Sequence, residues 1–189
     1  AENSCFSQNS PERVINEISE LTSLHQPLLL HFLDNAMSPA LMCSLAQKPP
    51  GVSWYGFSRF ERQLENPEFC QALKKSGCVM LKLGLESGSQ KVLDQMNKGI
   101  NLNRAVRILV NLRNAGIATY IYLLFGTPYE TEKEARLTME FVSRHHQAIT
   151  FLNLAIFNMP VCSSEAHEVL DRFSDGDLSL YCDFDHPDG

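Results

Sequence analysis

The sequence predicts an α/β fold, a partial (β/α) TIM-like barrel of about five parallel strands with outer helices. Three observations support this. Short apolar segments with strand-type composition alternate with helical segments along the chain. The helices have recognisable ends. The chain of 189 residues is shorter than the roughly 250 residues of a complete eight-strand barrel, so we expect an open arc with exposed edge strands.

Five segments are expected to form strands that are buried on both faces or nearly so. Strands separated by helical crossovers pair in parallel, through right-handed connections. The expected strands cover residues 28–33, 52–57, 79–83, 117–125 and 149–157.

Local capping patterns delimit the expected helices. In three helices a Pro follows a capping residue directly, where its missing N–H costs nothing. Gly116 suits a left-handed C-cap, and Thr131 with Glu134 fits a capping box. The Pro-initiated starts are Ser10-Pro11, Ser38-Pro39 and Asn66-Pro67. The expected helices cover residues 11–24, 39–47, 67–76, 90–97, 103–115, 131–145 and 164–173.

The charge distribution divides the chain into a barrel domain, residues 1–160, and a C-terminal helix with an acidic tail, residues 161–189. The whole chain has 16 Lys and Arg against 22 Asp and Glu, a net charge of −6. This balance provides no excess of positive charge to attract the phosphates of a nucleic acid, so nucleic acid is not an expected partner. The absence of a run of about 18 apolar residues argues against a membrane span, and we expect a cytoplasmic protein.

The cysteine spacing argues against a metal site built from these residues alone. No C-x-x-C or other close pair occurs, whereas structural zinc and iron–sulfur sites need thiolates that short spacings bring together. We therefore expect no metal ligands in this chain and interpret most of the cysteines as small buried hydrophobes. The six are Cys5, Cys43, Cys70, Cys78, Cys162 and Cys182.

Polar and Gly-containing segments follow all five expected strands. The carboxyl ends of parallel strands form the usual active-site edge of such folds. Carboxylates at Asp34 and Glu86 accept hydrogen bonds from ammonium and sugar hydroxyls, and the guanidinium of Arg59 binds a carboxylate. These groups suit a zwitterionic, ribose-bearing ligand. A purely structural interpretation stays open for each residue taken singly: Asp34 capping a helix, Arg59 pairing with Glu61, or Ser87 capping the helix near Gln90.

Several motifs carry a family resemblance. The segment 81–135 contains G-x-E-S-G-S, V-L-x-x-M-x-K-G, a helix ending A-G-I, and G-x-P-x-E-T. Upstream lie HFLDNAMSP and WYGFSRFE, and downstream lies NLAIFNMP. Together these resemble the radical S-adenosylmethionine (radical SAM) enzyme core, in the branch often fused to cobalamin-binding domains. The resemblance covers about residues 28–160, some two-thirds of the chain.

The resemblance implies S-adenosylmethionine and a 4Fe-4S cluster as cofactors of the parent protein, and it leaves cobalamin open without residue support. Asp34 would hold the methionyl amino group, and Arg59 would face the cofactor from the third strand of the family's barrel. Glu86 and Ser87 would face the ribose or carboxylate. The residues implied to flank the adenine are Leu124, Gly126 and Asn158.

The sequence departs from the family pattern at its front. The family binds its cluster through C-x-x-x-C-x-x-C after the first strand, but only 27 residues precede Leu28 here, and their one cysteine is Cys5. Without a cluster, reductive cleavage of S-adenosylmethionine has no chemical basis. We therefore interpret the chain as a fragment of a radical SAM Fe-S oxidoreductase that is not active alone and whose partner is the missing N-terminal part.

Two other interpretations stay open. One is a non-catalytic interaction module on the barrel scaffold, which binds a partner or a second copy through its edge strands and acidic tail. The other is an unrelated, metal-free α/β-barrel enzyme whose rim binds a phosphate or sugar. Binding of S-adenosylmethionine at the rim would distinguish both from the radical SAM interpretation.

Overall fold

A computed structural model describes residues 9–160 and 181–182. Its centre is one five-stranded sheet in which every neighbouring pair is parallel and the strand order follows the chain order. This confirms the predicted α/β class. The strands are β1 (Leu29–Phe32), β2 (Ser53–Ser58), β3 (Cys78–Glu86), β4 (Ala118–Phe125) and β5 (Phe151–Ile156).

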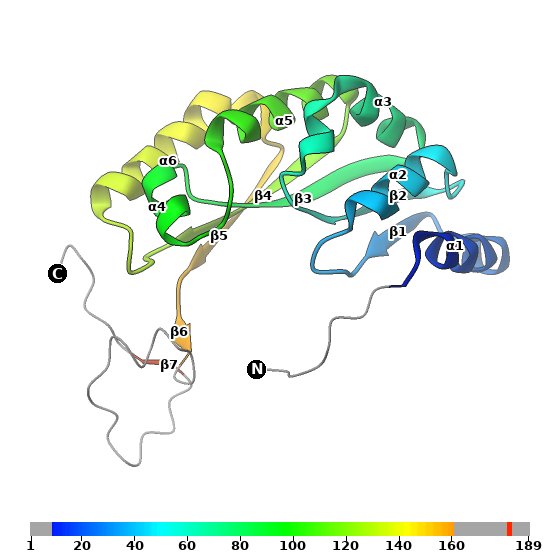
Figure 1. Cartoon of the computed structure of the whole chain (residues 1–189), viewed down its shortest axis with the longest axis horizontal. Coiled ribbons are helices and arrows are strands. Elements are labelled where there is room, and N and C mark those ends of the chain that lie inside the picture. Colours follow the sequence, from blue (N-terminus) through cyan, green and yellow to red (C-terminus); the bar gives the residue numbers. More distant parts are fainter. Residues whose placement is uncertain (1–8, 161–180, 183–189) are drawn as a thin grey trace, which may run out of the picture.

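The helices gather on one side of this sheet, and the N-terminal helix lies beside the β1 edge (Figure 1). Two short 3₁₀ helices, which local capping patterns do not predict, precede α3 and β5 and are labelled η1 and η2. The helices are α1 (Pro11–His25), α2 (Pro39–Gln47), η1 (Arg62–Glu65), α3 (Pro67–Lys75), α4 (Gln90–Gln95), α5 (Leu102–Ala115), α6 (Glu132–His145) and η2 (His146–Ala148).

The helix ends follow the predicted caps. The side chains of Ser10, Ser38 and Asn66 each accept a hydrogen bond from a backbone N–H in the first turn of the helix that follows. Gly116 adopts a left-handed conformation with φ 76° after α5, which a residue without a Cβ adopts readily. The expected helix over 164–173 lies outside the described residues.

Alternate side chains of the strands separate a dry face from an open face. On β3, Leu81, Leu83 and Leu85 are fully buried beneath the helices, whereas Met80 and Lys82, which alternate with them, are only half-buried. The expectation that the strands are buried on both faces is therefore wrong for the described part of the chain. Period-two burial of this kind is typical of a sheet covered on one side.

Strand β3 also runs further than its sequence suggests. The expected strand ends at residue 83, but β3 continues to Glu86 and contains an irregularity in its pairing with β4 between Gly84 and Glu86. Gly weakens the interior of a strand and often marks a bulge, so the local signal for a strand stops at Gly84 although the strand continues. The antiparallel pair β6 (Met159–Pro160) and β7 (Tyr181–Cys182) was also not expected.

None of the helices in the described ranges has both the length and the apolar composition that crossing a membrane requires.

The start of α6 is fixed by a capping box that also binds a lysine. Thr131 donates both its backbone N–H and its hydroxyl to the Glu134 carboxylate, and Lys91 Nζ lies 3.1 Å from Glu134 Oε1. The Thr131 hydrogen bond and then the Lys91 contact lower the pKa of Glu134 from 4.5 to about 2. The ionised carboxylate therefore couples α6 to α4.

We expect this capping box to make stability pH-dependent in the acid range. Because the pKa of Glu134 is lower in the folded chain, its contribution is complete above pH 4.5 and is lost as pH falls towards 2. Glu134→Gln should remove that contribution and flatten the acid limb of a urea-unfolding series. Glu20→Gln, on the exposed face of α1, is the control. Identical acid limbs for the wild type and Glu134→Gln would contradict this.

Candidate functional site

The structure brings the predicted site residues to one edge of the sheet. This edge, formed by the carboxyl ends of the strands and the loops that follow them, is the rim. Asp34 lies two residues beyond the end of β1, Arg59 directly follows β2, and Glu86 ends β3. Gly126 directly follows β4 and Asn158 lies two residues beyond β5. Because all neighbouring strands are parallel, these five positions share the carboxyl edge.

Glu86 has a backbone conformation that L-residues seldom adopt. Its φ is 66°, although it is neither Gly nor Asn, and it lies at the pairing irregularity at the end of β3. The left-handed conformation costs about 1–2 kcal/mol for a residue with a Cβ. Such strain persists only where the surrounding structure over-determines it, and it is enriched at functional sites. Glu86 is therefore the strongest candidate on the rim.

The Glu86 side chain folds back over Gly84. A Cβ at Gly84 would lie 2.7 Å from Glu86 Oε1, so the carboxylate occupies the space that a larger residue would fill. Lys98 Nζ lies 3.8 Å from the same oxygen, and the Glu86 side chain is 23% exposed. The rim thus presents a carboxylate that has one cationic neighbour and remains open to a ligand.

The next three residues of the G-x-E-S-G-S motif face the opposite way, towards α6. Ser87 Oγ lies 3.1 Å from Thr138 Oγ1 and accepts the backbone N–H of Ser89 at 3.1 Å. The N–H of Gly88 donates to Thr138 Oγ1 at 2.9 Å. Ser87 is fully buried, so its hydroxyl holds the helix and does not point to solvent at the rim. Sequence reasoning missed Thr138, which no local pattern singles out.

Gly88 permits this close packing. A Cβ at this position would lie 2.7 Å from Thr138 Cα, 2.8 Å from Phe141 Cβ and 3.0 Å from the Leu137 carbonyl oxygen. Two of these three atoms belong to the backbone of α6, which cannot yield as a side chain can. The motif therefore combines the strained backbone of Glu86, which carries the carboxylate, with a close contact between Gly88 and α6 that fixes the adjacent backbone.

Asp34 and Arg59 remain available to a ligand. Both are exposed, and neither forms an ion pair within the described residues. The cap of α2 is Ser38, not Asp34. The Arg59 carbonyl accepts from Ser58 Oγ at 2.9 Å and from the Glu61 N–H at 2.8 Å, which orders the backbone beneath the guanidinium.

The end of β4 forms a turn closed by a buried carboxylate. Gly126 has φ 73°, and its N–H donates to Glu130 Oε2 at 2.7 Å. The Glu130 N–H donates to the Thr127 carbonyl at 3.0 Å, and Glu130 is 2% exposed. The G-x-P-x-E-T motif is thus a self-contained loop whose Glu positions the backbone at Gly126. Sequence reasoning recognised the motif but did not assign this role to Glu130.

The two remaining predicted residues lie on either side of this turn. Leu124 is half-buried on β4 opposite Ala155 of β5. Asn158 is exposed, and its Nδ2 donates to the Ile156 carbonyl at 3.3 Å. The edge near β4 and β5 therefore offers backbone and apolar surface, while the edge near β1 to β3 offers charge.

The described cysteines do not fit an iron–sulfur cluster. Cys43 lies on α2, Cys70 lies on α3, and Cys78 opens β3 at the edge opposite the rim. Burial raises the pKa of Cys70 to about 11 and that of Cys78 to about 12, as expected of small thiols packed in the core. Within residues 9–160 no group of three His, Cys, Asp or Glu side chains gathers as a metal site.

The rim residues do fit S-adenosylmethionine by their chemistry. Its ammonium and ribose hydroxyls require acceptors, which the partly exposed Glu86 carboxylate and the exposed Asp34 provide. Its carboxylate requires a donor, which Arg59 provides. At Gly126 no side chain covers the left-handed turn, and a Cβ built there would lie 3.8 Å from Ile156 Cγ2.

Comparisons with known proteins show which family this chain resembles. Residues 56–142 match the family model of the radical SAM superfamily. An uncharacterised methyltransferase of Pyrococcus horikoshii is 29% identical over 142 residues, which cover 72% of this chain and 30% of that protein. The bacteriochlorophyllide d C-12(1)-methyltransferase of Chlorobaculum tepidum is 32% identical over 83 residues, 43% of this chain and 18% of that protein. The chain thus spans less than a third of these relatives.

Solved structures share the fold. The radical S-adenosylmethionine methyltransferase TsrM of Kitasatospora setae, with cobalamin and a [4Fe-4S] cluster bound, superposes with a TM-score of 0.65 at 18% identity, over 79% of this chain and 31% of TsrM. The cobalamin-dependent radical enzyme OxsB, with aqua-cobalamin bound, gives a TM-score of 0.62 at 13% identity, over 76% of this chain and 24% of OxsB. The sheet therefore has the architecture of a radical SAM barrel.

We predict that Glu86→Gly yields a more stable chain than Glu86→Ala, by about 1 kcal/mol, because only the alanine keeps a Cβ in the left-handed conformation. Urea unfolding of the two variants measures the difference. The same pair at Glu17, in the middle of α1, should give the opposite sign, since Gly costs about 1 kcal/mol in a helix. Equal stability of the two Glu86 variants would show that the backbone there is unstrained.

We predict that Gly88→Ala destabilises the chain by about 2 kcal/mol, the usual size of an overpacking penalty. Gly84→Ala is the matched control, because its added methyl group meets only the mobile end of the Glu86 side chain. It should leave the unfolding midpoint nearly unchanged while displacing the carboxylate. Similar midpoints for the two alanine variants would refute the close contact with α6.

Proposed function

Because residues 56–142 match the family model of the radical SAM superfamily, we propose that the five strands form the later part of a radical SAM core and hold S-adenosylmethionine across their carboxyl edge. The observation that carries the proposal is Glu86, whose strained backbone presents a partly exposed carboxylate on the central strand. A chain that needed only a turn at this position would be more stable with Gly.

We assign each rim residue a role in binding. Asp34 accepts the methionyl ammonium, Arg59 pairs with the methionyl carboxylate, and Glu86 accepts from the ribose hydroxyls. Ser87 contributes indirectly, since its hydroxyl bonds to Thr138 and steadies the backbone after Glu86. The positions proposed to flank the adenine are Leu124, Gly126 and Asn158.

The cluster belongs to another part of the assembled enzyme under this proposal. S-adenosylmethionine and a 4Fe-4S cluster are the cofactors that membership of this superfamily implies, and when bound the cluster supplies the electron for the reaction. The sequence contains no C-x-x-x-C-x-x-C, and Cys43, Cys70 and Cys78 lie on three different elements. We therefore propose that a segment carrying this motif is the partner of the chain.

Methyl transfer is the reaction type that the relatives favour. Two relatives are named as methyltransferases, and the TsrM structure is of a methyltransferase with cobalamin bound. We propose methyl transfer in place of the oxidoreductase activity expected from the sequence, with cobalamin as a candidate second cofactor. No comparison supports the alternative of a non-catalytic interaction module. Self-association through edge strands and a cytoplasmic location stay predictions.

S-adenosylmethionine binding tests the proposal directly. The purified chain should give a saturable, weak signal in ligand-observed NMR with S-adenosylmethionine. Glu86→Gln and Arg59→Ala should each weaken binding about tenfold, the usual effect of losing a charge-assisted hydrogen bond. Glu20→Gln is the control. Absence of saturable binding by the wild type, or equal affinity in the wild type and both rim variants, would overturn the proposal.

A further inference from the structure

The open face of the sheet carries a continuous aromatic surface. Tyr120 lies between Tyr122 and Phe151, with ring centroids 5.1 Å and 5.9 Å away, and Tyr122 lies 5.3 Å from Phe57. These rings come from β2, β4 and β5 and project away from the helices. Phe57, Tyr120 and Tyr122 are partly exposed, and Phe151 is 50% exposed. The side of the sheet that the helices leave open is therefore lined with ring edges and faces.

One cation lies within this surface. Lys82 Nζ of β3 is 4.7 Å from the ring centroid of Phe57 and 5.3 Å from that of Tyr55. It also lies 3.5 Å from His31 Nε2, whose ring stacks on Tyr55 at 4.2 Å. Within the described ranges Lys82 forms no ion pair. The aromatic surface therefore holds a positive charge with no carboxylate partner there.

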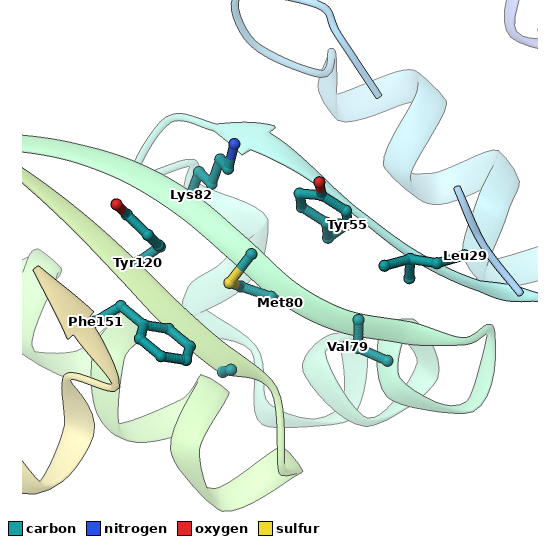
Figure 2. Close-up of a pocket in the computed structure, with 8 residues that line it drawn as sticks. Leu29, Tyr55, Val79, Met80, Lys82, Tyr120 and Phe151 are labelled. Atoms are coloured by element: carbon teal, nitrogen blue, oxygen red, sulfur yellow. The ribbon is translucent and has the colours of Figure 1, made fainter. Parts of the chain in front are cut away.

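The surface is hollowed where the cation lies. A depression of about 550 Å³ opens over the amino-terminal halves of the strands. Figure 2 shows Lys82 between Tyr55 and Tyr120, with Met80 below it. This volume falls in the range of small-molecule sites, which combine apolar walls with a few polar groups that fix orientation.

The positive charge of Lys82 indicates which kind of molecule the open face binds. A face that packed only on apolar surface would bury Lys82 without an anion, which costs more than the packing gains. A second copy on a two-fold axis would bring the same patch against itself, and hence one lysine near the other. A flat anionic ligand satisfies both parts of the face, since rings stack on the aromatic side chains and a carboxylate pairs with the ammonium.

We propose that this face binds a planar, conjugated carboxylic acid, with its rings on Tyr120 and its carboxylate on Lys82 Nζ. The inference rests on the proposed function, because it assigns the substrate class of the same barrel. Glu86 lies four positions after Lys82 on β3, a span of about 13 Å at 3.3 Å per residue. A conjugated ligand anchored at Lys82 therefore extends towards the cofactor edge.

Pyrenecarboxylate and its uncharged analogue pyrenemethanol test this assignment by fluorescence titration of the full chain. Lys82→Met keeps the side-chain length and should weaken pyrenecarboxylate binding about tenfold, while pyrenemethanol binding changes little. Tyr120→Leu should weaken both probes several-fold, because it removes the stacking surface. Lys75→Met, an exposed lysine on α3, is the control and should bind both probes as the wild type does.

The outcomes separate this inference from the proposed function. Equal loss of both probes in Lys82→Met, or no preference of the wild type for the acid, overturns the inference. A sedimentation run under the titration conditions adds a second criterion: a dimer that excludes the probes overturns it, and a monomer that binds them supports it. Titration of S-adenosylmethionine is scored separately through Glu86→Gln, so that failure at the rim contradicts the proposed function alone.

Discussion

The contact between Gly88 and α6 is the constraint on which the candidate site depends. The backbone at Gly88 approaches Thr138 so closely that no side chain fits between them, and Ser87 and Gly88 both bond to the Thr138 hydroxyl. Each such hydrogen bond contributes about 1 kcal/mol, which together offsets the strain at Glu86. Because the chain must turn from the sheet to this helix within one residue, the backbone before it adopts the left-handed conformation.

Because of this turn, the two faces of the sheet have different roles. Residues after Glu86 pack on the helix side, where the fully buried Leu81, Leu83 and Leu85 provide hydrophobic stability. Glu86 folds to the other side over Gly84, above the face that carries Lys82. A charge is tolerated there because that face is only half-buried. The stability of the sheet and its binding chemistry thus use alternate residues of one strand.

The sequence predicts features with local causes and misses those with distant ones. Helix starts are predicted to within about one residue, because Pro and the capping residue beside it act locally. The shared edge of the rim follows from parallel topology, so Asp34, Arg59 and Glu86 could be grouped in advance. The partner of Ser87 is 51 positions away at Thr138, and no local pattern identifies it. The open face was missed for a similar reason, since a tyrosine in a strand does not reveal which side a helix covers.

Glu86 illustrates how a conflict between backbone and side chain marks a binding site. Gly would relax the left-handed conformation, and Asn or Asp would tolerate it better than Glu. Gly lacks an acceptor, and Asp is one methylene shorter, so neither could fold back over Gly84 to the position 3.8 Å from Lys98. Gln26 is also left-handed, with φ 45°, but it is the C-cap of α1, where a left-handed residue is common. The proposed binding role of Glu86 therefore rests on a residue that opposes its own backbone where the loops of a parallel sheet converge.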